Sequence, residues 1–509
     1  MNETLEKLKL LNKDLKKVKA YFLDNIKKMQ SSVHIYTHID ADGLCSGAIL
    51  GKALYRAGIP FQLEILKQLE REEIDKIATH TIRNPDVFMI FSDFGSGQYI
   101  ELQNNQVIKE NQASFLILDH HLPQKISSKE DLKNLEELHQ STNPWHINPY
   151  FYGIDGSNEV SGAGICYYFV KCLSEVNIDL SAIAIIGAIG DIQNRGPNKS
   201  FQGLNSLVLD DGINSGLIEV VDDLNFSSIR PLNEAIAFSS EIELPGLSNH
   251  GNKALKFLQT LGILIENSEG NVRSLSDMNK DEKQKISSGI IEYATLKLNI
   301  EPMEVYQKLI VNRYLLKNEK QNSELYDSNE FSRLLNACGR TNNGSLGIAI
   351  AMGDRKNAYY QAQETLVNYK KALVQSLTWI KEEEKIQEKD YIQFFFGEDV
   401  ISENIVGTIS SMLIFDNSGI INRNKPVFGY AKREDEDVYK ISARAHEQVV
   451  NQGVNLSEAI REALRLTNLD ALGGGHPPAA GTKVPIDKIE EFLDNCNLVI
   501  KKQLSRPKN

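Results

Sequence analysis

The sequence predicts an N-terminal α/β domain, a helical connector and a C-terminal α+β domain, and three observations lead to this fold class. From Val33 to Asp191, short apolar β-rich runs alternate with helical stretches, which is typical of a mainly parallel sheet buried on both faces. Residues 201–330 carry longer helical patterns with polar breaks such as SLSDMNKDEKQ. From residue 331 onward, strand patterns and helical patterns occur together again, which predicts a second domain.

The elements of the first domain follow from the spacing of apolar residues. Residues 1–30 place apolar side chains three or four positions apart, which predicts a leading amphipathic helix packed on its own domain. The strands expected next are VHIYTH, FQLEIL, VFMIFSD and SFLILDHH, which start at residues 33, 61, 87 and 114. Two consecutive buried helices are expected at 162–176 and 181–191.

The second domain is expected to combine four strands with four helices. The strands are LGIAIAMGD, YIQFFFGED, PVFGYAKRE and VYKISARA, which start at residues 346, 391, 426 and 438. Helices are expected at 355–388, 402–413, 456–466 and 486–503. The glycine-rich turn GGGHPPAAG (Gly473–Gly481) lies near the end of this domain.

Composition and charge narrow the class of protein. Hydrophobic residues make up 41% and charged residues 24% of the 509 residues, which is typical of a folded, soluble protein of several domains. The formal net charge of −12 disfavours anionic partners, so any nucleic acid must be bound by a local group of cationic side chains. Five scattered cysteines without a CxxC pair predict neither a disulfide framework nor a zinc site. Because no secretion signal or membrane-spanning run is found, we expect a cytoplasmic protein without membrane contact.

Acidic and histidine residues stand at the ends of three of the expected strands. These residues are His38, Asp40, Asp42, Asp93, Asp119, His120 and His121. In an open parallel sheet, groups just past the carboxyl ends of the strands converge on one crevice. Buried carboxylates that converge repel one another unless cations neutralise them, so a metal centre is expected here.

The type of ligand indicates which metal would be bound. Oxygen ligands with added imidazole suit Mn²⁺ or Mg²⁺ better than structural zinc. The set exceeds the needs of one ion, whereas two ions about 3.5–4 Å apart can share a bridging carboxylate and activate a water. Asp191, at the end of an apolar helix, is a further candidate ligand. Each motif alone has a structural alternative, because Asp42 or Ser46 could cap a helix and Asp93 could occupy a turn.

Several motifs resemble a known family. HIDADG, SDFGSGQ, ILDHH and GDIQ resemble the four motifs of the DHH phosphoesterase superfamily, and GGGHPPAAG resembles the glycine-rich histidine motif of its associated DHHA1 domain. LNACGR (Leu335–Arg340) and ISAR (Ile441–Arg444) resemble the RecJ branch, and residues 229–248 resemble a segment of the archaeal RecJ-like GINS-associated nucleases. The resemblance implies a DHH catalytic domain at 31–200, a helical insertion at 201–330, a DHHA1 substrate-binding domain at 331–509 and an active site in the cleft between the domains.

The resemblance also implies roles for individual residues. One metal ion would be held by His38, Asp40 and Asp93, and the other by Asp42, Asp93, His120 and Asp191, with Mn²⁺ favoured over Mg²⁺. Asp119 would orient its neighbours, and His121 would face the scissile phosphate or the leaving group. The residues expected to bind substrate are Arg340, Ser442, Arg444, Gly474, Gly475 and His476.

The residue types at the C-terminal motifs suit a phosphate ligand. Three consecutive glycines let backbone N–H groups approach an anion, and His476 can add a directed donor. Arg340 and Arg444 present planar forks that match phosphate oxygens. The alternatives are a surface ion pair for Arg444 and a flexible loop for GGGH.

The expected function is that of a two-metal exonuclease. The resemblance implies 5′ to 3′ digestion of single-stranded DNA to mononucleotides, in DNA replication or repair. One alternative is a phosphodiesterase of short RNA or cyclic dinucleotides. Another is a replisome scaffold that binds the GINS complex, since a eukaryotic helicase cofactor of this superfamily is a catalytically degenerate relative that binds GINS.

Overall fold

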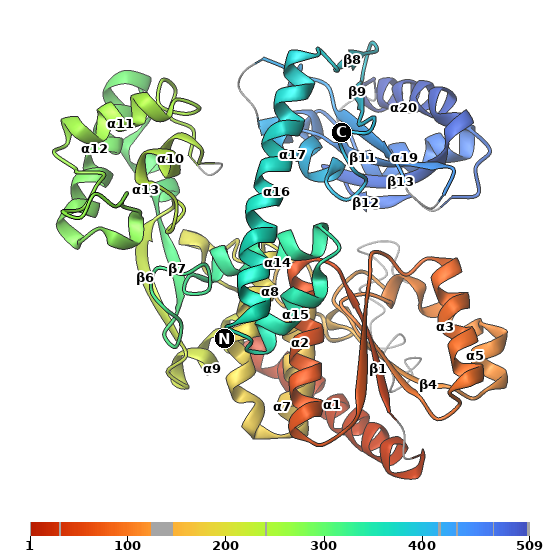
Figure 1. The fold of residues 1–509 in the computed structure, drawn as a ribbon. Coiled ribbons are helices and arrows are strands. Elements are labelled where there is room, and N and C mark those ends of the chain that lie inside the picture. The colour runs from red at the N-terminus through yellow and green to blue at the C-terminus, as the bar shows by residue number, and fades with distance from the viewer. Residues whose placement is uncertain are drawn as a thin grey trace. The chain divides into compact units, whose positions relative to one another are not determined.

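The computed structural model describes residues 2–29, 32–123, 146–239, 242–415, 419–433, 436–471 and 473–505. The chain divides into two compact units, Met1–Thr365 and Leu366–Asn509 (Figure 1). Among the described residues, no helix has both the length and the apolar character needed to cross a bilayer.

The first unit is built on a parallel sheet that contains the four strands predicted from the sequence and a fifth strand, β5 (His146–Ile147), that is not predicted. Its strands are β1 (Val33–His38), β2 (Phe61–Leu66), β3 (Phe88–Ser92), β4 (Ser114–Leu118) and β5 (His146–Ile147), in the order β2-β1-β3-β4-β5. β1, β3 and β4 are almost entirely buried because their continuous apolar runs pack on both faces of the sheet. The edge strand β2 instead alternates between more and less exposed side chains.

Helices cover both faces of this sheet. One face packs on α3 (Arg71–Arg83), α4 (Tyr99–Asn104) and α5 (Gln106–Glu110) through a shared apolar core. The other face packs on α2 (Ala41–Arg56) and α7 (Gly162–Leu173), which are followed by α8 (Ser181–Gly190) and α9 (Gly203–Asn214). The leading helix α1 (Asn2–Met29) joins this second layer, where the ring of Phe22 contacts those of Phe88 and Phe169.

A helical insertion follows α9. It contains α10 (Leu232–Ala237), α11 (Gly251–Thr260), α12 (Lys280–Leu298) and α13 (Pro302–Leu309), which share an apolar core of their own. A two-stranded antiparallel ribbon of β6 (Ile218–Leu224) and β7 (Ile310–Leu316) flanks it in the chain. The helical character predicted for 201–330 is confirmed, but the ribbon is not predicted from the sequence.

Two helices follow the ribbon in the first unit, and one of them differs from the sequence prediction. α14 (Ser328–Arg340) is followed by α15 (Gly344–Met352), where LGIAIAMGD was expected to be a strand. Because the run is uniformly apolar, its pattern does not separate a buried helix from a buried strand. α15 packs against α2 and α14, and it ends where Gly353 takes a left-handed conformation (φ 119°). The second unit therefore starts at Leu366, whereas the sequence predicts a domain boundary near 331.

The second unit contains a six-stranded mixed sheet. The long helix α16 (Asn357–Glu382) leads into β8 (Gln387–Glu388), β9 (Gln393–Phe396), β10 (Val427–Lys432), β11 (Val438–Arg444), β12 (Gly474–His476) and β13 (Ala479–Pro485). Their order is β12-β13-β11-β10-β9-β8, and only the β9–β10 pair is parallel. α19 (Leu456–Leu466) and α20 (Ile489–Leu504) cover one face, and α17 (Val406–Phe415) packs on the other. The short helix α18 (Glu447–Asn451) follows β11.

Candidate metal centre

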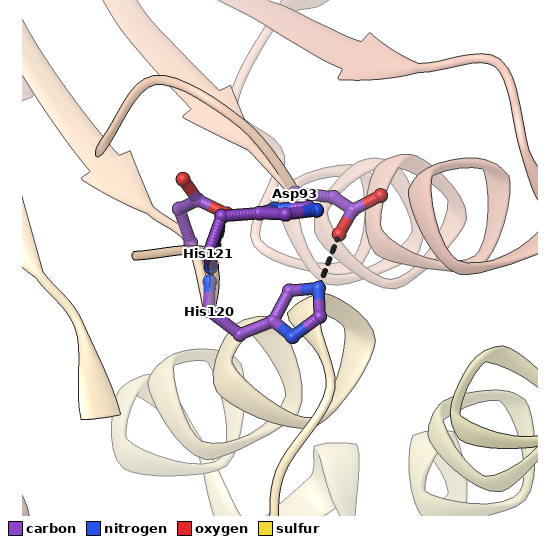
Figure 2. A group of neighbouring side chains, drawn as sticks. Asp93, His120 and His121 are labelled. Carbon is purple, nitrogen blue, oxygen red and sulfur yellow. Dashed lines mark hydrogen bonds and ion pairs between the residues drawn. The ribbon is translucent and has the colours of Figure 1, made fainter. Parts of the chain in front are cut away.

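The ends of three parallel strands bring acidic and histidine side chains together in the first unit. His38 is the last residue of β1, Asp93 follows β3, and His120 lies two residues after β4. Asp93 takes a left-handed backbone conformation (φ 63°), which is uncommon for residues other than glycine. Its Oδ2 lies 3.5 Å from His38 Nδ1 and its Oδ1 lies 3.2 Å from His120 Nε2. Figure 2 shows the His120 ring directed at the Asp93 carboxylate.

The neighbouring side chains form three overlapping groups with the composition of a metal site. One comprises His38, Asp40 and Asp93, a second comprises Asp42, His120 and Asp191, and a third comprises Asp93, Asp119, His120 and His121. Within each group the candidate ligand atoms lie within 4.8 Å of one another. Because Asp93 contacts both His38 and His120, the first two groups form one continuous cluster of six residues. The structure thus brings together all the residues predicted to be metal ligands, and ligation itself stays a prediction.

The charges in this cluster fit divalent cations. Burial and the nearby Asp93 carboxylate raise the pKa of Asp42 well above its usual value, and burial also raises the pKa of Asp191. Both oxygens of Asp93 are buried and accept no hydrogen bond from the described residues. Divalent cations would relieve the repulsion among these carboxylates and bind the buried Asp93 oxygens, which lie beside the His38 and His120 rings.

Neighbouring carboxylates raise the pKa of His38 and His120, and a hydrogen bond fixes the orientation of the His120 ring. Although burial alone would lower the pKa of each ring, Asp40 and Asp93 raise the pKa of His38, and Asp191, Asp93 and Asp42 raise that of His120. His120 Nδ1 lies 2.6 Å from the carbonyl oxygen of Gly156, which can only accept, so Nδ1 carries a proton and donates. His120 Nε2, on the side of Asp93, is therefore the nitrogen available to a cation.

Asp119 is saturated with hydrogen bonds. Its Oδ1 accepts from the backbone N–H groups of His120 (2.7 Å) and His121 (3.1 Å) and from His121 Nδ1 (2.8 Å), while Oδ2 accepts from the Ser96 N–H (2.9 Å). Against the effect of burial, these neighbours lower the pKa of Asp119 well below its usual value. The side chain of His121 is 51% exposed, and Nε2 is its ring nitrogen that remains accessible. This geometry fits the orienting role predicted for Asp119.

The start of α7 supports the cluster in a way that sequence analysis does not identify. The Asp42 carboxylate accepts hydrogen bonds from the backbone N–H groups of Gly162 (2.7 Å) and Ala163 (3.0 Å). A Cβ at Gly162 would lie 2.8 Å from Asp93 Cβ and 2.9 Å from Asp93 Cγ, which is too close for any side chain. The available signal is the SGAG run before an apolar helix, in which Ser161 caps α7.

α14 supports the loop between His38 and Asp42. Asn336 Oδ1 accepts a hydrogen bond from the backbone N–H of Ala41 (3.0 Å), and Gly339 packs directly against the Ile39 carbonyl group. Arg340, at the end of the same helix, is close enough to Asp40 to help lower its pKa, together with His38 and against the effect of burial. LNACGR therefore supports the loop of candidate metal ligands, and its predicted substrate-binding residue Arg340 lies beside that loop.

A buried polar network fixes the loop after β4. Ser96 Oγ lies 2.8 Å from His146 Nε2 and accepts a hydrogen bond from Asn148 Nδ2 (2.8 Å). Asn148 Nδ2 also lies 2.8 Å from the His121 carbonyl oxygen, to which it donates. Burial lowers the pKa of His146 to about 4, so this ring is neutral at pH 7. His146 and Asn148 lie outside the motifs and Ser96 is a motif residue without a predicted role, so the sequence does not predict this network.

The predicted substrate residues of the second unit gather on its sheet. The register places His476, Ala479 and Arg444 in one row across three strands. Gly474, Gly481 and Ser442 form a second row two positions along, so the two rows face the same side of the sheet. Side chains of paired residues point to the same face, so the small residue Ala479 lies between His476 and Arg444. Arg444 Nε donates to Ser411 Oγ (2.8 Å) and Nη1 donates to the Ala443 carbonyl oxygen (2.8 Å). Gly475 belongs to the alternate row, opposite Ala480, and its φ of 136° favours glycine.

Comparisons with known proteins agree with this architecture. The chain matches three family profiles: the DHH family, N-terminal domain, at residues 32–190; the DHH-CID domain at 227–309; and the DHHA1 domain at 393–502. The chain belongs to the DHH/DHHA1 superfamily of phosphoesterases and has the RecJ-like architecture. An uncharacterized protein of Methanocaldococcus jannaschii is 31% identical over 503 residues, which cover 99% of this chain and 100% of that protein.

Two solved structures show the same fold. CDC45 from Entamoeba histolytica has a TM-score of 0.63 at 13% identity, and the match covers 96% of this chain and 99% of that one. RecJ from Thermus thermophilus, in complex with Mn²⁺, has a TM-score of 0.54 at 16% identity over 96% of this chain. The present chain spans 55% of the length of that RecJ.

Proposed function

We propose that this protein is a divalent-cation-dependent exonuclease that digests single-stranded DNA in the 5′ to 3′ direction and releases mononucleotides. The observation that carries the proposal is the buried cluster in which the Asp93 carboxylate contacts both His38 and His120 and so links the groups of candidate ligands. RecJ from Thermus thermophilus, which shares the fold, was solved in complex with Mn²⁺, and this supports a divalent cation in the proposed site.

Different residues of the chain would hold the cations and donate a proton to the leaving group. His38, Asp40 and Asp93 would hold one cation, and Asp42, Asp93, His120 and Asp191 the other. Bound cations of this kind neutralise developing charge on a phosphoryl group and lower the pKa of water. Asp119 holds the His121 ring by a 2.8 Å hydrogen bond, so His121 Nε2 is positioned to give a proton to the leaving oxygen.

Binding of the strand is assigned to the second unit and to α14. Ser442, Gly474, Gly475 and His476 would contact phosphate oxygens together with Arg444, whose guanidinium Ser411 orients. Arg340 would bind a phosphate near Asp40.

A digestion time course tests the proposal. Matched single-stranded DNA and RNA oligonucleotides, labelled at either end, are incubated with Mn²⁺ and wild-type protein or Asp93→Ala. We expect mononucleotides at once from the 5′ label of DNA, late release from the 3′ label, and none with the variant. Preferred cleavage of RNA or of a cyclic dinucleotide would move the assignment to the corresponding phosphodiesterase.

The Asp93→Ala protein also separates catalysis from binding. Because the variant lacks a candidate ligand but keeps Arg444 and its neighbours, turnover should fall far more than affinity for the oligonucleotide. Affinity is measured by fluorescence anisotropy on the uncleaved strand. Equal losses of both would contradict the division of labour between the two units.

A second candidate function is that of a GINS-binding replisome scaffold. The likeness to CDC45 over 99% of that chain, and the DHH-CID match at residues 227–309, favour it. Binding and catalysis are compatible, since all the motif carboxylates and histidines are present. Affinity capture with purified archaeal GINS complex as bait tests it, and no retention of the protein would exclude this role.

A further inference from the structure

Gln193 is a buried amide that lies between two candidate metal ligands. The residue is 1% exposed and lies in the turn after α8, two positions beyond Asp191. Its Nε2 donates to Asp191 Oδ2 (2.8 Å) and to the Gly156 carbonyl oxygen (2.8 Å). The same carbonyl oxygen accepts from His120 Nδ1 (2.6 Å), so one amide and one carbonyl contact both ligands.

Asn205 of α9 fixes which way this amide faces. Asn205 is 1% exposed, and its Nδ2 donates to Gln193 Oε1 (2.7 Å). A flipped Gln193 amide would place its oxygen against the Asp191 carboxylate and the Gly156 carbonyl oxygen, which both accept, and would turn its NH₂ group toward the Asn205 NH₂ group. The hydrogen bond from Asn205 therefore aims the Gln193 NH₂ group at Asp191.

The backbone between the two residues is unusual. Ile192 has a φ of 55°, a left-handed conformation that β-branched residues rarely adopt, and its side chain is 61% exposed. At this turn the Ile192 side chain faces solvent, whereas the side chains of Asp191 and Gln193 face the cluster. The backbone N–H groups of Ile192 and Gln193 donate to the carbonyl oxygens of Ile189 (3.0 Å) and Ala188 (2.9 Å), so this conformation closes the end of α8.

We propose that Gln193, held by Asn205, is a positioning residue for the cation site formed by Asp42, Asp93, His120 and Asp191. The inference rests on the proposed function, because it assumes that the cluster binds two cations. Gln193 contacts Asp191 and lies 3.3 Å from His120 Nδ1, and both belong to the same group of candidate ligands. Its loss should weaken this one site and leave the site of His38, Asp40 and Asp93 unchanged.

Mn²⁺ titration of the full-length, chelator-stripped protein tests the inference. Isothermal titration calorimetry should show two Mn²⁺ ions for wild type. For Gln193→Met, which keeps side-chain length but removes the amide, we expect one dissociation constant to rise about 10- to 100-fold while the other stays constant.

Gln393→Met is the matched control. Gln393 is also fully buried, and its Nε2 donates to the carbonyl oxygens of Asn422 (2.7 Å) and Lys425 (2.9 Å). It lies on β9 of the second unit, so its loss should lower the thermal midpoint without changing either Mn²⁺ affinity. The control separates lost stability from lost positioning.

Asn205→Ala keeps the inference testable if Gln193→Met does not fold. This variant retains Gln193 but frees its amide, and the same Mn²⁺ site should weaken by a smaller factor. Unchanged affinities in a folded variant, or equal weakening of both sites, would overturn the positioning role while the proposed function stands. Fewer than two Mn²⁺ ions bound to wild type would overturn the proposed function and this inference with it.

Discussion

Gly162→Ala is expected to disable the metal centre by moving Asp93. A Cβ at this position would lie 2.8 Å from Asp93 Cβ, and ordinary contacts begin at 3.4 Å, so one side must shift by at least about 0.6 Å. Asp93 is fully buried and is the residue that contacts His38 and His120 together. A displacement approaching 1 Å costs about 100-fold in rate at a positioned site, and overpacking costs about 1–3 kcal/mol of stability.

The assay compares turnover and unfolding with those of a matched glycine variant. Gly251 is the first residue of α11, as Gly162 is of α7, but a Cβ there would meet only Asn233 Nδ2 at 3.8 Å. Gly251→Ala should therefore keep wild-type turnover in the Mn²⁺-dependent digestion, while Gly162→Ala loses about 100-fold. Wild-type turnover in the Gly162→Ala protein would refute the argument that Asp93 must stay where it lies.

Three further predictions concern other parts of the chain. Asp327→Ala leaves the Arg313 guanidinium buried without its carboxylate and should lower the free energy of unfolding by about 3–5 kcal/mol in urea melts, with a change below about 1 kcal/mol arguing against it. His146 has a pKa of about 4 when folded and 6.5 when unfolded, so only the unfolded chain gains a proton on this ring as pH falls through that window. Between pH 6.5 and pH 4, the free energy of unfolding of wild type should thus fall by up to about 3 kcal/mol more than that of His146→Gln. Parallel pH profiles of the two proteins in urea unfolding would contradict this. Arg444→Ala should weaken binding of single-stranded DNA and reduce its salt dependence in anisotropy titrations, whereas an unchanged salt slope would favour the ion-pair alternative.

The parallel sheet and its acidic edge were predictable because their signals are local. Strands that are buried on both faces have short, continuous apolar sequences. The parallel topology is then sufficient to bring Asp93 and His120 to one edge of the sheet. The strand predicted at LGIAIAMGD is wrong, since α15 is a helix: LGIAIAM is apolar at every position, so it shows neither helical nor strand periodicity. Its helical state depends on packing against α2 and α14, which no local pattern records.

The residues that support the cluster were harder to predict because they act across long stretches of chain. Asn336 accepts from Ala41, 295 positions away, and Gly162 donates to Asp42, 120 positions away. A candidate metal ligand can be predicted from its residue type and position, since a carboxylate at a buried strand end needs a partner. An amide or a glycine that orients such a ligand carries no comparable signal until the fold brings the two together.

The β6–β7 ribbon has a consequence for how this chain could have arisen. Leu224 and Ile310 are paired neighbours, so the backbone leaves and returns at one point although 85 residues lie between them. A segment with adjacent ends and its own apolar core can be inserted, exchanged or lost through a single genetic event, with little disturbance to the structure that hosts it. The helices between these two residues can therefore change with little effect on the strand ends that carry His38 and Asp93.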